Sequence, residues 1–524
     1  MATQSTRTGT SNDPAVVPGR SILFSRPDLH RDDQDEADPR VLTDLNLDQV
    51  FAAMAGKDGH LRRLLLRPLH DIDEVRFRQE VMRDLEDPTL RGSVEGFCLR
   101  MRSVDAYLKH VAALRHRYQR QGWFLDAAVV YCEAVAELTL ELARHRLASR
   151  GLVGFRDHLD AYVASDAFTD LVSETKAVRD ALADVRYTVH MKSGLVTVRS
   201  FEGEPDYSVD VEETFARFRQ GAVKDYSVDI RTWTGMNHVE ERILDLVARN
   251  HPVAFSALDD FCVGHGRFID PSIAAFNRDV RFYLAYLELT DPIRAAGLRF
   301  SHPEMSASKE TSASDAFDLA LARKRVDGGS SVVTNDFALE GRERVLVVTG
   351  PNQGGKTTFA RTVGQLHYLA GLGYPVPGSR ACLLLPDRVF THFEREERIE
   401  TLSGKLEDEL IRIRDILREA TGNSVLIMNE SFTSTTLEDA RFLGREILGR
   451  LIAMDLVGVY VTFVEELASI NEAIVSMVSV MDVDDPVTRT YRIERRPADG
   501  LAYAAALAEK YGLTRADVTR TVTP

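Results

Sequence analysis

Residues 350–357 have the residue types and the spacing of a phosphate-binding loop. They read Gly350-Pro351-Asn352-Gln353-Gly354-Gly355-Lys356-Thr357, a complete match to the pattern GxxxxGK[ST]. Backbone N–H groups of such a loop point at phosphate oxygens, the lysine adds positive charge beside the β- and γ-phosphates, and the threonine hydroxyl is a hard ligand for Mg²⁺. The loop therefore predicts a site for a nucleoside triphosphate with Mg²⁺, and Thr358 begins the helix that follows it.

Hydrolysis requires a second group, which orients or deprotonates a water molecule beside the γ-phosphate. The candidate is Glu430, because it follows the apolar segment 424–428 and is expected at the carboxyl end of a buried strand, where open α/β sheets bind their ligands. We therefore predict Glu430 and Lys356 as the catalytic residues. Asn429 stands where a strand–Asp–Glu motif supplies a metal-site aspartate. Its amide can bond to metal-bound water but carries no charge, so we expect weak retention of Mg²⁺.

An α/β domain over residues 331–524 is expected to position these groups. Apolar segments, predicted as strands, alternate there with segments of helical pattern. The expected strands are 332–334, 344–349, 381–385, 424–428, 457–462 and 488–493, and the expected helices are 357–371, 404–420 and 436–453. Nearly continuous Val, Ile and Leu in these strands indicates a sheet that is largely covered on both faces.

The chain before residue 331 is predicted to be mostly helical. Residues 1–40 lack apolar periodicity and contain the acidic run 31–38, which predicts a disordered tail. Helical patterns fill residues 41–305, except for short β-type segments near 185–233 that predict a small β-rich insertion. Residues 306–330 include a run of small polar side chains, so we interpret them as a linker that leads into the α/β domain.

Composition limits the class of protein. At 524 residues the chain is too long for one core, and 44% hydrophobic with 28% charged residues is typical of a soluble protein. No segment is apolar for long enough to span a membrane, so we expect no membrane partner and a cytoplasmic location. The net charge of −15 excludes a surface that binds nucleic acid everywhere, so a DNA contact requires a local basic patch. The four cysteines lie far apart, which indicates neither a zinc site nor a disulfide framework.

Over residues 335–470 the chain resembles the MutS family of DNA mismatch repair ATPases. The loop GPNQGGKTTF is similar to that family's GPNxGGKST, and Asn429-Glu430 with Ser434-Thr435-Thr436 takes the place of its DE and GTST elements. Leu402-Ser403-Gly404-Lys405 lies where the family has its signature loop, and Thr462-Phe463 lies where it has a Thr-His switch. A looser similarity to the family's helical core domain begins near residue 45.

The resemblance implies a multidomain fold: an α-helical core and lever domain with a small β-rich insertion, followed by an ABC-type P-loop ATPase domain. It implies ATP and Mg²⁺ as cofactors, and it adds Asn335, Ser403, Gly404 and Thr462 to the nucleotide-binding residues. Ser403 and Gly404 would face the γ-phosphate held by a second subunit, so a homodimer is expected. The simpler alternative is that Ser403 only caps the helix 404–420. Residues 500–520 would form a helix-turn-helix segment that packs the dimer.

Two departures from the family's pattern limit this expectation. The helical-core pattern starts near residue 45, so we expect the N-terminal mismatch-reading domain to be missing and do not infer mismatch recognition. Phe463 replaces the histidine that senses the γ-phosphate in the family, so we expect slow turnover.

The favoured hypothesis is a homodimeric ATPase that opens and closes a clamp on DNA and selects the backbone or the shape of DNA without reading its sequence. One alternative is a nucleotide-gated dimeric scaffold with little hydrolysis. Another is the ATPase subunit of a transporter, although the long helical part does not fit it. The densest basic cluster could hold DNA phosphates, or it could be an ordinary solvated helix surface. It consists of Lys109, His110, Arg115, His116, Arg117 and Arg120.

Overall fold

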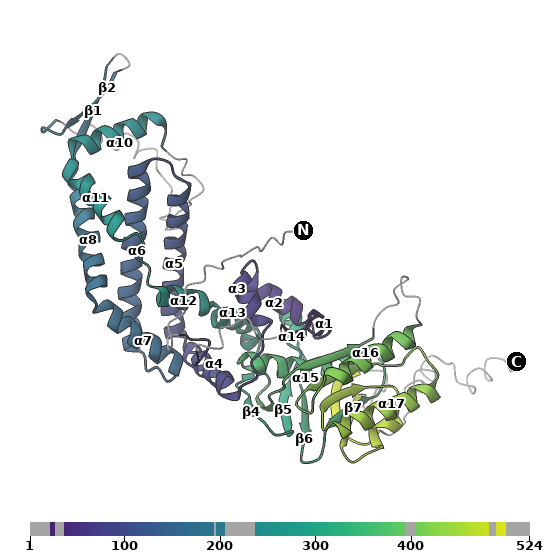
Figure 1. Cartoon of the computed structure of the whole chain (residues 1–524). Coiled ribbons are helices and arrows are strands. Elements are labelled where there is room, and N and C mark those ends of the chain that lie inside the picture. Colours follow the sequence, from purple (N-terminus) through teal and green to yellow (C-terminus); the bar gives the residue numbers. More distant parts are fainter. Residues whose placement is uncertain are drawn as a thin grey trace, which may run out of the picture. The chain divides into compact units, whose positions relative to one another are not determined.

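The computed structural model describes residues 21–26, 36–192, 195–204, 236–394, 404–481 and 489–498. The chain divides into two compact units, whose elements are labelled in Figure 1. Among the described residues, the first unit contains 88–146 and 155–277. The second contains 21–26, 36–87, 147–154 and the described residues from 278 onward. None of the described helices is both long and apolar enough to cross a membrane.

The first unit is helical, as the sequence predicts. All or most of each of the following helices belongs to it: α5 (Pro88–Ala113), α6 (Arg117–Arg144), α7 (Arg150–Val163), α8 (Asp166–Ala183), α10 (His238–Asn250), α11 (Pro252–Gly264) and α12 (Pro271–Asp279). Leu90, Val94, Phe97, Met101 and Val104 are buried on α5, and their spacing of four and three residues places them on one face. That face gives the helix its packing surface against α6.

A two-stranded antiparallel hairpin lies in the range predicted for the β-rich insertion. It pairs β1 (Tyr187–Lys192) with β2 (Leu195–Ser200), in a register that sets Val189 opposite Val198. Val198 packs against the cluster that α10 and α11 form around Phe255. Residues 205–235, the rest of the predicted insertion, lie outside the described residues.

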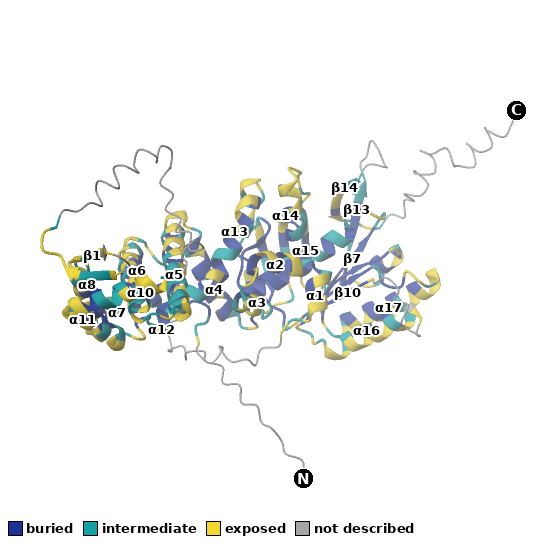
Figure 2. Cartoon of the chain, turned by 90° about the horizontal axis from the view of Figure 1, so that it is seen from above, coloured by how far each residue is buried: buried dark blue, intermediate teal, exposed yellow. Residues whose placement is uncertain are grey.

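The second unit contains a six-stranded sheet in the order β10-β11-β12-β7-β13-β14. Its strands are β7 (Val345–Thr349), β10 (Val389–Phe393), β11 (Val425–Asn429), β12 (Val457–Val461), β13 (Ile474–Met481) and β14 (Arg489–Arg495). All pairings are parallel except that of β14 with β13. Every residue of β7, β11 and β12 is buried, and Figure 2 shows β7 in the buried colour. The expected sheet with both faces covered is therefore present.

Alternate side chains of these strands enter two different layers. Val345, Val347, Leu426 and Met428 pack against α16 (Lys405–Glu419), α17 (Leu437–Ala453) and the short helix η3 (Glu465–Ser469). On the other face, α15 (Lys356–Leu372) lies so close that a Cβ atom at Gly364 would be 3.2 Å from Ile427. Because successive side chains of a strand point to opposite faces of the sheet, each helix layer contacts every second residue of a strand.

The second unit also contains a four-stranded sheet and six further helices. The sheet has the order β4-β9-β5-β6, and a small pair joins β3 to β8. These strands are β3 (Phe300–Ser301), β4 (Glu304–Ser306), β5 (Thr311–Ala316), β6 (Asn335–Leu339), β8 (Val376–Pro377) and β9 (Arg380–Leu384). The helices are α1 (Pro39–Asp44), α2 (Leu47–Ala55), α3 (Gly59–Leu65), α4 (Ile72–Leu85), α13 (Arg281–Ala295) and α14 (Leu319–Asp327).

The predicted linker over 306–330 is wrong, because this range forms β5 and α14. In β5, Thr311, Ala313 and Ala316 are buried. Backbone also approaches this strand closely, since a Cβ atom at Gly378 would be 2.9 Å from the Ser314 carbonyl oxygen. Exposed and buried residues alternate with little apolar contrast here, so composition does not mark the strand.

The predicted tail over 1–40 is also wrong for the residues of that range that the structure describes. Ile22 and Leu23 are buried, and α1 already begins at Pro39. The predicted boundary between domains differs as well, since residues 36–87 belong to the same compact unit as the α/β sheet. These contacts join segments that are far apart in the sequence, so the composition of each segment alone does not predict them.

Arg78 of α4 hydrogen-bonds to the segment 21–26 and to the end of α15. It is buried, and its guanidinium donates to the carbonyl oxygens of Leu23 (3.1 Å) and Leu372 (3.2 Å), the latter being the last residue of α15. Immediately after α15, Tyr374 stacks on Tyr286 of α13, with ring centroids 4.1 Å apart and planes 5° apart. The end of α15 is thus fixed by α4, α13 and the segment 21–26.

Replacing Gly373 by alanine should destabilise the second unit. Gly373 has φ 85°, and a Cβ atom there would lie 2.6 Å from Arg78 Cβ. Left-handed backbone and overpacking together should lower the free energy of unfolding by roughly 2–5 kcal/mol, which thermal unfolding measures. The matched control is Gly92→Ala inside α5, where a Cβ atom meets nothing within 4 Å. This control should stabilise its helix by about 1 kcal/mol. Equal melting temperatures for both variants would contradict the packing described at Gly373.

Candidate nucleotide-binding site

The loop 350–355 connects the carboxyl end of β7 to the first residue of α15. Gly350, Gln353 and Gly355 have φ values of 117°, 63° and 96°, in the left-handed region that favours glycine. A Cβ atom would lie 2.9 Å from Ser479 Cβ if placed at Gly350 and 2.2 Å from Ser479 Oγ if placed at Gly354. Conformation and crowding therefore both require glycine in this loop.

Ser479 of β13 supports the loop and was not predicted. Its buried hydroxyl donates to the Gly354 carbonyl oxygen at 2.8 Å. The two residues are 125 positions apart, and one of two serines in an apolar strand carries no local signal of this contact. The sequence could show it only once the neighbours of β7 in the sheet were known.

Lys356 lies at the amino end of α15 with its side chain 3% exposed. Its Nζ donates to the carbonyl oxygens of Gly350 (2.7 Å) and Pro351 (3.3 Å) and to Asn352 Oδ1 (3.3 Å). Burial lowers the pKa of the Lys356 amine, and the Glu430 carboxylate nearby opposes this shift. Phosphate oxygens would satisfy this buried cation better than neutral carbonyl oxygens do, because they carry charge.

Glu430 follows β11 directly, as predicted, and lies across from the loop. Its Oε1 is 4.0 Å from Lys356 Nζ, and its backbone N–H donates to the Val461 carbonyl oxygen at 3.0 Å. The structure therefore brings together the two residues predicted to be catalytic, although they are separated by more than seventy positions.

Several buried polar atoms at the carboxyl ends of β7 and β11 lack a hydrogen-bond partner among the described residues. They are Asn429 Oδ1, Thr349 Oγ1 and Ser431 Oγ. Buried polar atoms are rarely left unpaired, so these positions indicate room for bound water or a polar ligand. Oxygen atoms of this kind fit the water shell of Mg²⁺. Thr357, the predicted Mg²⁺ ligand, and Thr358 are both half-buried in the first turn of α15.

Thr462 and Asn335 are bonded to backbone. The Thr462 hydroxyl accepts the N–H of Val464 at 3.0 Å. The Asn335 amide donates to the Tyr491 carbonyl oxygen at 3.2 Å and accepts the N–H of Ile493 at 2.7 Å. Asn335 thus holds the backbone of the edge strand β14. Its link to the loop is indirect, since it bonds to Tyr491, which lies beside Gly355.

The edge strand β14 borders the loop with two side chains that sequence reasoning missed. A Cβ atom at Gly355 would be 3.5 Å from the Tyr491 carbonyl oxygen, and the Tyr491 ring is half-exposed. Arg489 donates to Gln353 Oε1 at 2.5 Å. Tyr491 has φ 58°, so the strand is irregular at this point. An exposed aromatic ring beside a phosphate loop can stack on a nucleotide base.

Backbone strain is concentrated after Glu430. Glu430 and Phe432 have φ values of 52° and 65°. Left-handed conformations of non-glycine residues cost about 1–3 kcal/mol each and persist where the surroundings hold them. Phe432 is wholly buried in the core beneath α16 and α17. The turn that carries Glu430 is therefore held in place by its neighbours.

Two predicted groups remain untested. Ser403 and residues 500–520 lie outside the described residues. Gly404 is exposed and occupies the N-cap position of α16. A role of Ser403 and Gly404 in a second subunit's site stays a prediction.

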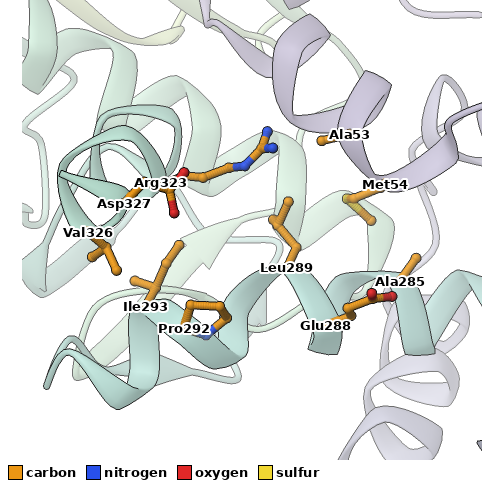
Figure 3. A pocket seen from close by; sticks show the side chains of 10 residues that line it. All are labelled: Ala53, Met54, Ala285, Glu288, Leu289, Pro292, Ile293, Arg323, Val326 and Asp327. Carbon is orange, nitrogen blue, oxygen red and sulfur yellow. The ribbon is translucent and has the colours of Figure 1, made fainter. Parts of the chain in front are cut away.

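Two cavities of the second unit lie elsewhere. Figure 3 shows one of about 270 Å³ between α2, α13 and α14, with Arg323 reaching across it towards Ala53. Another, of about 900 Å³, is lined by parts of α1, β10 and α16. Neither is lined by residues 350–357 or by Glu430. The described residues also include no group of three His, Cys, Asp or Glu side chains that could hold a metal ion. A metal here would thus depend on hydroxyl, amide, water and phosphate oxygens.

Comparisons with known proteins agree with this geometry. Residues 346–521 match the model of MutS domain V. A stretch of 184 residues is 30% identical to an Endonuclease MutS2 of Thermus thermophilus and covers 34% of this chain and 24% of that protein. A stretch of 200 residues is 27% identical to a DNA mismatch repair protein MutS of Lawsonia intracellularis and covers 37% of this chain and 22% of that protein.

These matches span about a quarter of the length of the relatives and about a third of this chain. They confirm the resemblance seen in the motifs: the C-terminal part of the chain is similar, at low identity, to MutS-family proteins.

Filling the space beside the loop should weaken nucleotide binding. Gly354→Ala would place a Cβ atom against Ser479 Oγ, so the affinity for an adenine nucleotide should fall by roughly tenfold or more, since a misplaced loop loses several phosphate contacts. Adding Ser479→Gly removes the collision and should recover part of the affinity, which binding of a fluorescent ATP analogue measures. Ser479→Gly alone is the control. Full affinity in Gly354→Ala would contradict the contact between β13 and the loop.

Proposed function

We propose that this chain binds and hydrolyses ATP at the loop 350–357 and uses the nucleotide state to control its hold on DNA. The observation that carries this proposal is the placement of buried Lys356 opposite Glu430 at the carboxyl edge of the sheet. The phosphate loop after β7 supplies triphosphate binding, and the carboxylate after β11, which β12 separates from β7 in the sheet, supplies orientation of water. The resemblance to MutS domain V supports ATP as the nucleotide.

The residues take separate roles in this proposal. The amides of 350–355 and Lys356 hold the phosphates, while Thr357 and Asn429 hold Mg²⁺ through oxygen atoms. Glu430 orients the attacking water. Tyr491, with its backbone held by Asn335, contacts the base. When bound, Mg²⁺ would neutralise charge that develops on the transferred phosphoryl group.

We propose further that the working form is a homodimer, in which Ser403 and Gly404 of each protomer complete the site of the other. Large apolar side chains are exposed in the second unit after Glu430: Leu437 (61% exposed), Phe442 (64%) and Phe463 (42%). Large apolar side chains that are exposed in this way support burial by a partner.

The DNA contact that we propose is the outward face of the hairpin β1–β2. His190, Lys192 and Arg199 are exposed and share a strand face with Thr197, whereas Val198 on the opposite face packs against α10 and α11. Glu204 is a nearby acidic group: hydrogen bonds from the backbone at Glu202 and Glu204 lower the pKa of its carboxylate, and the charges of His190 and Arg199 add to this. Cationic and hydroxyl side chains on one face can hold phosphates without reading bases.

The cluster at 109–120 is a weaker candidate. His116 bonds to Asp245 at 3.1 Å, and Arg117 pairs with Asp259. The His110 ring packs on Trp123. These contacts engage three of the six side chains of the cluster within the protein, which supports the alternative of an ordinary helix surface.

Hydrolysis is tested by steady-state ATP turnover of the full chain. Glu430→Gln should lower kcat by roughly 10²- to 10³-fold and leave nucleotide affinity almost unchanged, because only the group that orients water is lost. Lys356→Ala should also weaken nucleotide binding, since it removes the buried cation. If the wild type is no faster than either variant yet binds ATP, the chain is a nucleotide-gated scaffold. The uncharged Asn429 and the exposed Phe463 are the features that favour this second function.

DNA binding is tested by a salt series on duplex, mismatched and junction DNA, with and without ATP. The logarithm of affinity should fall steeply with the logarithm of salt concentration, because phosphate contacts release counterions. The double variant Lys192→Ala with Arg199→Ala should weaken binding to all substrates and reduce the slope by about 2. Arg100→Ala, whose guanidinium pairs with Glu137, is the control and should leave the slope unchanged. Negligible binding of every DNA by the wild type would remove DNA from the proposal.

A further inference from the structure

Glu409 is a buried carboxylate on the helix that follows the expected signature loop. It lies in the second turn of α16, five residues after Gly404, and it is 5% exposed. Its Oε2 accepts the backbone N–H of Phe432 at 2.9 Å. This is a charge-assisted bond in a region that excludes water, and such bonds are the strong ones.

The bond ends two residues away from Glu430. Phe432 is in left-handed backbone conformation and has no exposed surface, so its side chain cannot move without disturbing the core beneath α16 and α17. At the other end of the same turn, the Glu430 N–H bonds to Val461 of β12. The Glu409 contact and the Val461 contact therefore fix the turn on both sides of the Glu430 side chain.

A second contact holds the turn from the neighbouring strand. The Thr433 hydroxyl donates to Glu394 Oε1 at 2.6 Å, just after β10. This contact is exposed and joins two side chains, whereas Glu409 binds the backbone itself and is buried. Displacement of α16 would therefore act on the position of Glu430 chiefly through Glu409.

We propose that Glu409 is a positioning residue for hydrolysis, which holds the turn that carries Glu430 and links the orientation of α16 to the water-orienting carboxylate. This inference rests on the proposed function. It adds a path within one protomer from the helix behind Gly404 to the catalytic residue. A nucleotide or partner that moves the start of α16 then changes the rate of hydrolysis without touching Glu430.

The test compares Glu409→Ala, Glu409→Gln and the control Glu407→Gln in the full chain. Glu407 lies in the first turn of the same helix, is exposed and carries the same charge. Glu409→Ala should lower kcat by roughly 10- to 100-fold, the scale expected when a reacting group is misplaced by about 1 Å. KM and the Kd for a nonhydrolysable ATP analogue should stay within about threefold, because the phosphate loop does not contact Glu409.

The conservative variant separates positioning from a general loss of structure. The amide oxygen of Glu409→Gln can still accept the Phe432 N–H, so its kcat should lie between those of the wild type and Glu409→Ala. Hydrogen exchange of the amides at 430–433 should be faster in Glu409→Ala than in Glu407→Gln. Thermal unfolding identifies a variant that fails to fold, in which case Glu409→Gln carries the test.

Each outcome has one meaning. An active wild type whose kcat is unchanged by Glu409→Ala, or a variant in which kcat and nucleotide affinity fall together, overturns this inference and leaves the proposed function standing. A wild type that binds ATP but does not hydrolyse it overturns both, since no reaction then exists for Glu409 to assist.

Discussion

Helix α15 is buried along nearly its whole length, and the organisation of the second unit depends on this constraint. Fourteen of its residues have almost no exposed surface. The helix begins at Lys356 and ends beside Arg78, so one rigid element joins the phosphate loop to α4, α13 and the segment 21–26. A helix packed on all sides cannot shift alone. A change at the loop must therefore be taken up by the sheet or by the helices at the far end.

The loop itself is held from two sides that are far apart in sequence. Ser479 and Arg489, from β13 and β14, bind Gly354 and Gln353 on one side. On the other side, Lys356 faces Glu430 at the end of β11. In the sheet, β13 lies beside β7 with β14 beyond it, and on the other side β12 separates β7 from β11, so both sets of side chains come from strands within two positions of β7. The order of the strands thus determines which side chains can touch the nucleotide.

The parts of the structure that could be predicted from the sequence are those marked by a contiguous motif or by the residues directly beside it. The phosphate loop is contiguous, and Glu430 is marked by the apolar strand before it, so both were found. The contacts of Ser479, Tyr491 and Glu409 depend on strand order and on irregular backbone, which one sequence does not reveal. The predicted linker failed because the small residues of β5, buried and exposed in turn, lack the apolar contrast that marks a strand. The predicted tail failed because two apolar residues, Ile22 and Leu23, give no periodic pattern.

The open glycines of the long helices have a mechanical consequence. Gly92 and Gly96 in α5 and Gly122 in α6 meet no neighbouring atom that would exclude a larger side chain. Packing therefore does not require them, yet each weakens its helix by about 1 kcal/mol relative to alanine. Local opening of the two helices therefore costs least around Gly92, Gly96 and Gly122. Alanine at these positions would strengthen each helix without disturbing its packing.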